Sequence, residues 1–189
     1  ARFCIYIAAR TAKFSDDPRY AKLAQGWGKD APRRMFVFLQ QQAFGSVPLV
    51  LWVYLAAKNP TPAMRLQEYV AFSFVGLAIR GEAIADWQLR HFQRDPATRG
   101  KILDPGLGAR SRHPNYFFEW VHWNSYILLA TASSFWWAPV LVACGLLYLL
   151  LFVTGIPPTE AQAIASRGDD YRDYQRTTSP FFPWPPRGK

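Results

Sequence analysis

The hydrophobic residues of this chain gather into four blocks, which are separated by polar, proline-rich or glycine-rich segments. A helix needs roughly 20 mostly apolar residues to cross the hydrocarbon core of a bilayer, and each block comes close to that length. The pattern therefore predicts an all-α integral membrane bundle with at least four transmembrane helices in this chain. The predicted helices cover residues 35–57, 69–89, 117–132 and 135–156.

The whole chain, residues 1–189, is predicted to form a single membrane domain. Residues 1–34 are interpreted as the end of an earlier apolar helix, "ARFCIYIAAR", followed by a polar cytoplasmic segment, so further transmembrane helices are expected upstream. Residues 35–156 hold the four predicted helices and a cytoplasmic loop over 90–116. Residues 157–189 form a cytoplasmic tail, in which "PPTEAQ" is typical of a helix start and "SPFFPWPPRGK" of an extended end.

Composition supports a membrane protein, and the distribution of charge predicts its orientation. Half of the residues are hydrophobic, 16% are aromatic and eight are tryptophan, which is unusual for a soluble domain. The net charge of +9 is typical of nucleic-acid-binding proteins, but the basic residues do not share one face. They concentrate before the first predicted helix, between the second and third, and in the tail. The positive-inside rule places these three segments in the cytoplasm, and we expect no nucleic-acid partner.

The second predicted helix carries charged residues that cannot face lipid. Glu82, Asp86 and Arg90 are four residues apart, so they share one helical face, and Gln93 and Arg94 follow about one turn later. Ionisable groups inside a membrane usually line a cavity or a pathway. This face therefore predicts a site near the cytoplasmic end of the helix, and the alternative is an ion-pair network that holds helices together.

The loop before the third predicted helix, "GARSRHPNYFFEW", places strongly polar residues against an aromatic run. Arginine donates two parallel hydrogen bonds to phosphate or carboxylate. Positive-inside topology explains the arginines alone, but not Pro114, which restrains the backbone just before the helix and presents the side chains behind it in a defined way. The candidate binding residues of this loop are Arg110, Arg112, His113, Asn115, Tyr116 and Glu119.

The tail offers a third candidate group, Glu160 with Tyr171 and Tyr174. The two tyrosines, three residues apart, share a helical face, and the alternative is an amphipathic helix that lies on the membrane. No metal site is predicted, because the three histidines and two cysteines lack ligand spacing. "GLGARS" is an incomplete dinucleotide-binding motif, and no strand precedes it.

Two stretches, "SRHPNYFFEW" and "TGIPPTEAQAIASRGDDYRDYQRTTSPFFPWPP", resemble the C-terminal half of bacterial membrane proteins related to steroid 5α-reductase, and of the sterol reductases. The resemblance implies a helical membrane bundle in the bacterial inner membrane with NADPH between the helices and the cytoplasmic loops. The chain departs from the sterol reductases or their relatives at Leu89, Gln93 and Gly108, where they have lysine, arginine and often tryptophan. The implied cofactor contacts are Asp86, Arg90, Gln93, Arg94, Leu103, Arg112, Asn115, Tyr116, Glu119, Glu160, Tyr171 and Tyr174, with His113 added from the same motif.

The resemblance implies an NADPH-dependent oxidoreductase that reduces an activated C=C bond in a steroid or lipid enone. Its partners are then a steroid or lipid-like substrate and membrane lipids. The catalytic residues stay open, and we expect them on earlier helices. One alternative is an S-adenosylmethionine-dependent methyltransferase of the isoprenylcysteine carboxyl methyltransferase type, which shares an RHPxY element. Another is a non-enzymatic membrane scaffold. The physiological substrate, the stereochemistry and the oligomeric state are not predicted, and a monomer is compatible with the sequence.

Overall fold

The computed structural model describes residues 18–187 except 59–63, 99, 104 and 132–133, and within these residues every regular element is helical. The interpretation of "ARFCIYIAAR" as the end of an earlier helix lies outside the described residues. The chain divides into two compact units, residues 1–48 and residues 49–189.

The first unit holds α2 (Pro18–Trp27), a 3-10 turn (Gly28–Asp30) and most of α3 (Ala31–Ala57). The ring of Trp27 lies edge-on to that of Phe38, with the centroids 6.1 Å apart. The polar segment predicted before the first membrane helix is therefore helical where the structure describes it. Pro48 lies inside α3 at the boundary between the two units.

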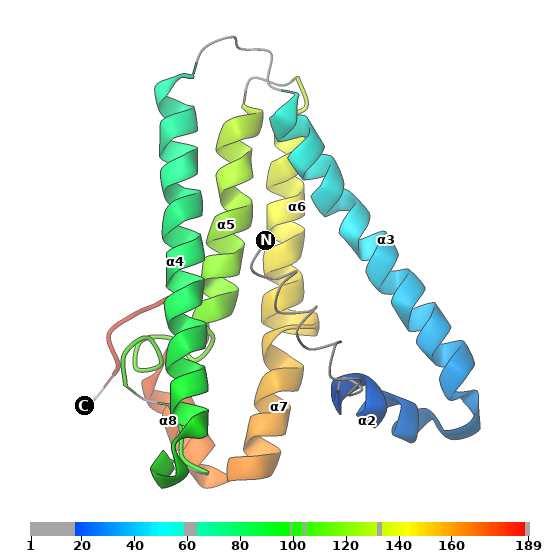
Figure 1. Ribbon diagram of the computed structural model, residues 1–189, viewed down its shortest axis with the longest axis vertical. Helices are drawn as coiled ribbons and strands as arrows, with labels where there is room; N and C mark the ends of the chain where they lie inside the picture. Colours follow the sequence, from blue (N-terminus) through cyan, green and yellow to red (C-terminus); the bar gives the residue numbers. More distant parts are fainter. Residues whose placement is uncertain (1–17, 59–63, 99, 104, 132–133, 188–189) are drawn as a thin grey trace. The chain divides into compact units, whose positions relative to one another are not determined.

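The second unit is built around α4 (Leu66–Arg94), α5 (Pro114–Ala130) and α6 (Trp137–Tyr148), which lie side by side (Figure 1). After α6 come a π-helical turn (Leu149–Val153), α7 (Ile156–Arg167) and α8 (Asp169–Thr177). Figure 1 shows α7 and α8 at the end of the bundle where α4 finishes and α5 begins. A short 3-10 turn (Pro96–Thr98) opens the loop between α4 and α5.

Small residues let α4 and α5 approach each other closely. Ala71, Ala78, Gly81 and Ala85 of α4 are buried. A Cβ atom on Gly81 would lie 2.3 Å from the ring of Phe118 on α5, so that position has no room for a side chain. Small residues at such a contact are common between membrane helices, because they allow van der Waals packing of the backbones.

Two continuous helical stretches are long and apolar enough to cross a membrane, Leu23–Ala57 and Trp137–Arg167. The apolar part of the second stretch ends near Ile156, and the remainder is polar. Helices also cover the other two predicted blocks, but α5 has 17 residues and α4 carries Arg80, Glu82 and Asp86. The all-helical prediction is thus confirmed for the described residues, and the membrane evidence in the structure consists of two helices.

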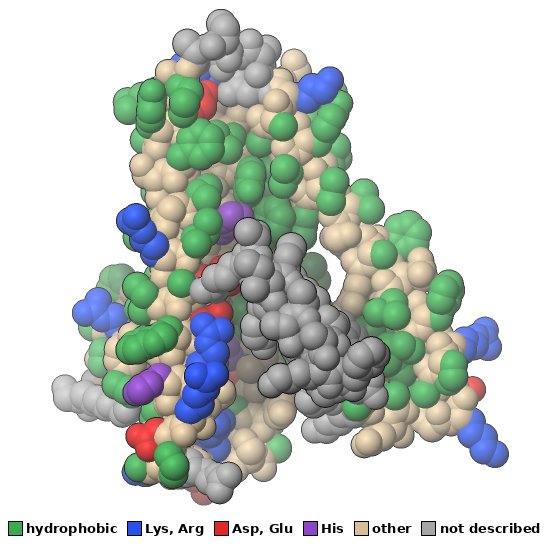
Figure 2. All heavy atoms as spheres, viewed as in Figure 1, with side chains coloured by type: hydrophobic (Ala, Val, Ile, Leu, Met, Phe, Trp, Pro, Cys, Tyr) green, Lys and Arg blue, Asp and Glu red, His purple; other side chains and the backbone are tan. Residues whose placement is uncertain are grey.

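Many large hydrophobic side chains of the helices are exposed. On α4 they include Phe72, Phe74, Leu77 and Ile79, and Figure 2 shows hydrophobic side chains along the surface of this helix. A soluble protein rarely exposes so much contiguous apolar surface. These side chains are compatible with contact with membrane lipid.

Candidate functional site

A cavity of about 350 Å³ lies at the end of the bundle where α4, α5, α7 and α8 meet. All three sequence regions that predicted a site contribute to it, although they are far apart in the chain. The lining residues are Ala85, Leu89, Gln93, Ile102, Leu103, Gly108, Arg112, His113, Pro114, Asn115, Tyr116, Thr159, Ala163, Arg167, Tyr171 and Tyr174.

The face of α4 that lines the cavity is offset by one residue from the predicted charged face. Ala85, Leu89 and Gln93 are four residues apart and line the cavity, whereas Asp86 and Arg90 follow one position later, about 100° around the helix. An oxygen of Asp86 lies 3.9 Å from a guanidinium nitrogen of Arg90. The Asp86 side chain also accepts a hydrogen bond of 3.4 Å from Asn115, so it reaches the cavity through that residue.

A buried polar network forms the back of the cavity. Glu160 accepts hydrogen bonds from Arg112 Nε at 2.6 Å and from Gln175 Nε2 at 2.7 Å, and His113 Nε2 lies 3.2 Å from the same carboxylate. Another Arg112 nitrogen donates to the carbonyl oxygens of Gln175 and Thr178. The side chains of Arg112 and Glu160 are 8% and 12% exposed, so this ion pair ties the start of α5 to α7, α8 and the tail in a site largely closed to water.

The network controls the protonation of Glu160. Burial by itself would raise the pKa of this carboxyl group, but hydrogen bonds from His113, Arg112 and Gln175, together with the charge of Arg112, lower the pKa from 4.5 to about 2. Glu160 lies beyond the apolar part of its helix. Because its pKa is about 2, the carboxyl group is ionised at neutral pH. The charge of Arg112 is balanced locally.

This low pKa predicts an acid-sensitive stability. Because the folded pKa is below the ordinary value, the contribution of Glu160 is complete above pH about 4.5 and is lost as the pH falls towards about 2. We expect the midpoint of thermal unfolding to fall more steeply from about pH 5 to about pH 3 in the parent protein than in a Glu160→Gln variant. Parallel pH dependences of the two proteins would contradict the assignment.

The two tail tyrosines lie next to each other on α8, with ring centroids 5.8 Å apart. Tyr171 is buried; burial and the nearby charge of Glu160 raise its pKa to about 12, so the hydroxyl keeps its proton. The Tyr174 hydroxyl donates to the carbonyl oxygens of Gly108 and Leu103 at 2.5 and 3.4 Å. Tyr174 therefore holds the loop between α4 and α5 against the tail helix.

Gly108 is required where the loop folds back on itself. A Cβ atom at this position would lie 2.2 Å from the carbonyl oxygen of Leu103. The tryptophan that often occupies this position in relatives of the sterol reductases does not fit the loop of this chain. Another loop contact is made by Gln88 of α4, which accepts a hydrogen bond of 3.0 Å from the backbone nitrogen of Leu107.

The predicted site residues fall into three groups. The cavity lining contains Gln93, Leu103, Arg112, His113, Asn115, Tyr116, Tyr171 and Tyr174. Asp86 and Glu160 bond to lining residues. Arg90, Arg94, Glu119 and Arg110 are exposed and are not among the lining residues.

Sequence reasoning missed Arg167, Gln175 and Gln88. Arg167 lies seven residues after Glu160 in α7, so helical spacing alone could have placed it on the same side. It lines the cavity and is exposed, which puts its guanidinium group at the rim. Gln175 and Gln88 carry no sequence signal, because their roles depend on segments that are distant in the chain.

Comparison with protein families shows which family the chain belongs to. The family described as "Protein of unknown function (DUF1295)" matches residues 1–178. The chain belongs to this family. It is also 32% identical over 74 residues to a methanethiol S-methyltransferase of Mycobacterium tuberculosis (strain ATCC 25618 / H37Rv), which covers 37% of this chain and 30% of that protein. The chain thus spans less than a third of the curated relative. No solved structure matches it.

The comparisons overturn the predicted reductase. The chain belongs to DUF1295 and is similar to a methyltransferase, so the steroid 5α-reductase family, NADPH and an oxidoreductase activity were wrong predictions. The RHPNY motif misled because an RHPxY element also occurs in the methyltransferases. The structure adds a physical reason: NADPH carries several phosphate charges, whereas Arg112 is neutralised by Glu160, and Arg90 and Arg94 are not among the lining residues.

Proposed function

We propose that the chain is part of a membrane methyltransferase that uses S-adenosylmethionine to methylate a thiol. The observation that carries the proposal is the cavity of about 350 Å³, in a chain similar to a protein named methanethiol S-methyltransferase. Its volume lies in the range of small-molecule sites.

The lining fits the chemical groups of S-adenosylmethionine. The ligand has one carboxylate and one ammonium group at its amino-acid end, a positively charged sulfonium, a ribose and an adenine ring. Tyr116, Tyr171 and Tyr174 bring three aromatic rings to the cavity, and aromatic faces attract cations and stack on planar rings. Asn115 offers an amide that can bind polar atoms of the ligand.

Among the described residues that line the cavity, Arg167 is an exposed arginine, and one such cation suits the single carboxylate of this ligand. Arg167 lines the cavity at its rim, and we assign it to the carboxylate because an arginine donates two parallel hydrogen bonds to such a group. Arg112 is paired with Glu160 at 2.6 Å, so its role is to hold α5, α7 and α8 in position. The other predicted contacts that line the cavity or bond to its lining residues remain candidates in this site, whereas Arg90, Arg94 and Glu119 do not line it.

Bound S-adenosylmethionine supplies an activated methyl group: the thiol sulfur forms a bond to the methyl carbon as the bond to the sulfonium breaks, and the thiol proton passes to water. The chain binds and orients the reactants. Ala85 and Leu89 give the cavity an apolar wall towards the bundle, which suits a small apolar thiol or a lipid-like one. We leave the catalytic residues open.

We also propose that α4 and α5 cross the membrane with the two more apolar helices, which makes at least four membrane helices in one domain. Support comes from the exposed apolar side chains of α4 and the close packing of α4 on α5. We propose a bacterial inner membrane as its location, and the charge distribution supports an orientation with the cavity and the tail on the cytoplasmic side.

Binding measurements on the purified full-length protein in detergent test the function. We expect saturable binding of S-adenosylmethionine and methyl transfer from a radiolabelled donor to a small thiol. An Arg167→Gln variant should bind the donor about tenfold more weakly, because a charge-assisted hydrogen bond is lost.

The matched control is Arg172→Gln, an exposed arginine of α8 that pairs with Asp169 at 2.6 Å and does not line the cavity. It should bind the donor like the parent protein. Equal losses in both variants would contradict the proposed carboxylate site. Methyl transfer to the carboxyl group of an isoprenylated cysteine, without methyl transfer to thiols, would show that the acceptor is a carboxyl group and not a thiol. Binding of NADPH without binding of the methyl donor would overturn the function.

A further inference from the structure

The segment after α8 folds back and is fixed by hydrogen bonds that involve its backbone, among them the bond from the Arg112 side chain to Thr178 O described above and the four that follow. Three join it to the loop before α5: Arg112 N to Ser179 O at 2.9 Å, Trp184 N to Arg110 O at 3.0 Å, and Ser111 Oγ to Phe181 O at 2.8 Å. The fourth closes the segment on itself, from Arg187 N to Thr177 O at 2.8 Å. The sequence predicted an extended end here, whereas the structure shows a closed loop.

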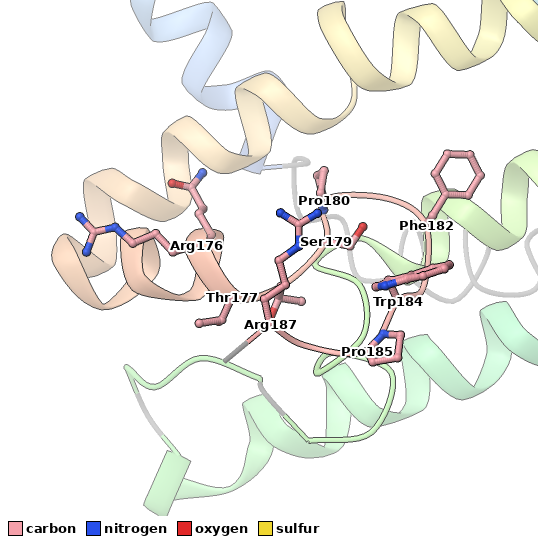
Figure 3. Close-up of a pocket in the computed structure, with 10 residues that line it drawn as sticks. Arg176, Thr177, Ser179, Pro180, Phe182, Trp184, Pro185 and Arg187 are labelled. Atoms are coloured by element: carbon pink, nitrogen blue, oxygen red, sulfur yellow. The ribbon is translucent and has the colours of Figure 1, made fainter. Parts of the chain in front are cut away.

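This loop and the last turn of α8 enclose a pocket of about 280 Å³. Arg176 and Arg187 line it together with Phe182 and Trp184, and Figure 3 shows Arg187 between α8 and the part of the loop that carries Trp184. The pocket shares no lining residue with the cavity assigned to the methyl donor. It is therefore a second site.

Aromatic contacts place this pocket at the ends of the apolar helices. The ring of Phe182 lies 5.9 Å from that of Phe117 and 6.1 Å from that of Trp120, both near the start of α5. The neighbouring Phe181 is buried in a hydrophobic cluster with Leu150 and Ile156, where the apolar part of the α6–α7 helix ends. If α5 and α6 cross a bilayer, the pocket lies at the depth of the headgroups.

The exposed groups of the pocket have the chemistry of a membrane interface. Trp184 and Phe182 are 66% and 51% exposed, and aromatic side chains, Trp above all, concentrate at the boundary between hydrocarbon and water. The planar guanidinium group of an arginine can donate two parallel hydrogen bonds to phosphate oxygens. Arg176 pairs with Asp173 at 2.8 Å, and Figure 3 shows its side chain directed away from Arg187, so Arg187 is the arginine assigned to the ligand.

We propose that this pocket binds the phosphodiester headgroup of an anionic phospholipid, with Arg187 on the phosphate and Trp184 and Phe182 against the upper acyl chains. The proposal rests on the membrane position of α5 and α6 but not on methyl transfer. Bound lipid would hold the tail against the membrane. The same tail contains Ser179, whose carbonyl oxygen accepts a hydrogen bond from the backbone nitrogen of Arg112.

The test is a titration of the full-length protein in detergent with short-chain phosphatidylglycerol and, separately, short-chain phosphatidylcholine. We expect tighter binding of phosphatidylglycerol. Arg187→Gln should weaken that binding about fivefold, since one arginine near an anionic lipid contributes about a fivefold factor. Arg176→Gln should change the binding little, because the Arg176 side chain points away from Arg187 (Figure 3). Trp184→Ala should weaken the binding of both lipids.

Arg172→Gln is the matched control, because Arg172 pairs with Asp169 three residues away as Arg176 pairs with Asp173, but does not line the pocket. A loss with Arg172→Gln equal to that with Arg187→Gln would show general charge attraction and overturn the pocket. Displacement by inorganic phosphate, with no preference between the lipids, would show a free-anion site and overturn the lipid. Binding of S-adenosylmethionine by the Arg187 variant, measured in parallel, shows that it is folded and separates this result from the proposed function.

Discussion

Replacing Glu160 with glutamine is expected to lower the free energy of unfolding by about 3 kcal/mol, because removing one charge of a buried ion pair leaves the other uncompensated. Arg112 Nε lies 2.6 Å from the carboxylate, and the two side chains are 8% and 12% exposed. Glutamine keeps the volume and one acceptor but cannot balance the guanidinium charge. The measurement is the unfolding midpoint of the purified protein in detergent, by heat and by denaturant.

Asp173→Asn provides the control for this prediction. Asp173 pairs with Arg176 at 2.8 Å, a similar distance, but the side chains are 71% and 76% exposed. Exposed pairs contribute about 0–1 kcal/mol, so this variant should unfold close to the parent protein. If both variants lost a similar amount of unfolding free energy, burial would not explain the contribution of the Arg112–Glu160 pair.

Replacing Gly108 with alanine is expected to destabilise the protein by about 1–3 kcal/mol, the usual cost of forcing an extra group into a packed site. The new Cβ atom would lie 2.2 Å from the carbonyl oxygen of Leu103, and a backbone atom cannot rotate away as a side chain can. The loop must shift, and with it the bond from Tyr174 to Gly108 O. We therefore expect binding of S-adenosylmethionine to be lost or strongly reduced.

The matched change for this prediction is Gly76→Ala in α4, where a Cβ atom meets no other atom within 4 Å. Alanine is a better helix former than glycine by about 1 kcal/mol, so this variant should be as stable as the parent or more stable. Donor binding should not change. A Gly108→Ala protein with normal stability and normal donor binding would show that the loop is not closely packed.

The helices were predictable because apolar periodicity and length are local properties. Helices cover most described residues of the first three hydrophobic blocks, and the fourth block spans α6 and the π-helical turn up to the start of α7. Helix α7 begins at Ile156, one residue before the proline signal at Pro157. The number of membrane crossings was less predictable than the helices themselves. The pattern predicted a membrane helix over residues 69–89, but α4 carries Arg80, Glu82 and Asp86 and is not among the two helices apolar enough to cross a membrane.

The candidate site was predictable as three groups of residues but not as a geometry. Asn115, Tyr116, Tyr171 and Tyr174 do line one cavity. Spacing by four identified a charged face of α4, whereas the lining face starts at Ala85, and a one-residue offset cannot be read from a helix without its partners. The family was mistaken because the RHPNY motif describes a local turn, and cofactor identity depends on charges from several segments.

The sequence by itself determined an α-helical, apolar and basic chain with a proline-restrained polar turn at the mouth of a bundle, because these properties arise from neighbouring residues and helical spacing. Only the tertiary structure decided which charges are available. It paired Arg112 with Glu160 across 48 residues, left Arg167 at the rim of the cavity and brought Arg187 back to α8. A charge acts through its distance and its exposure to water, and both are set by packing between segments far apart in the chain.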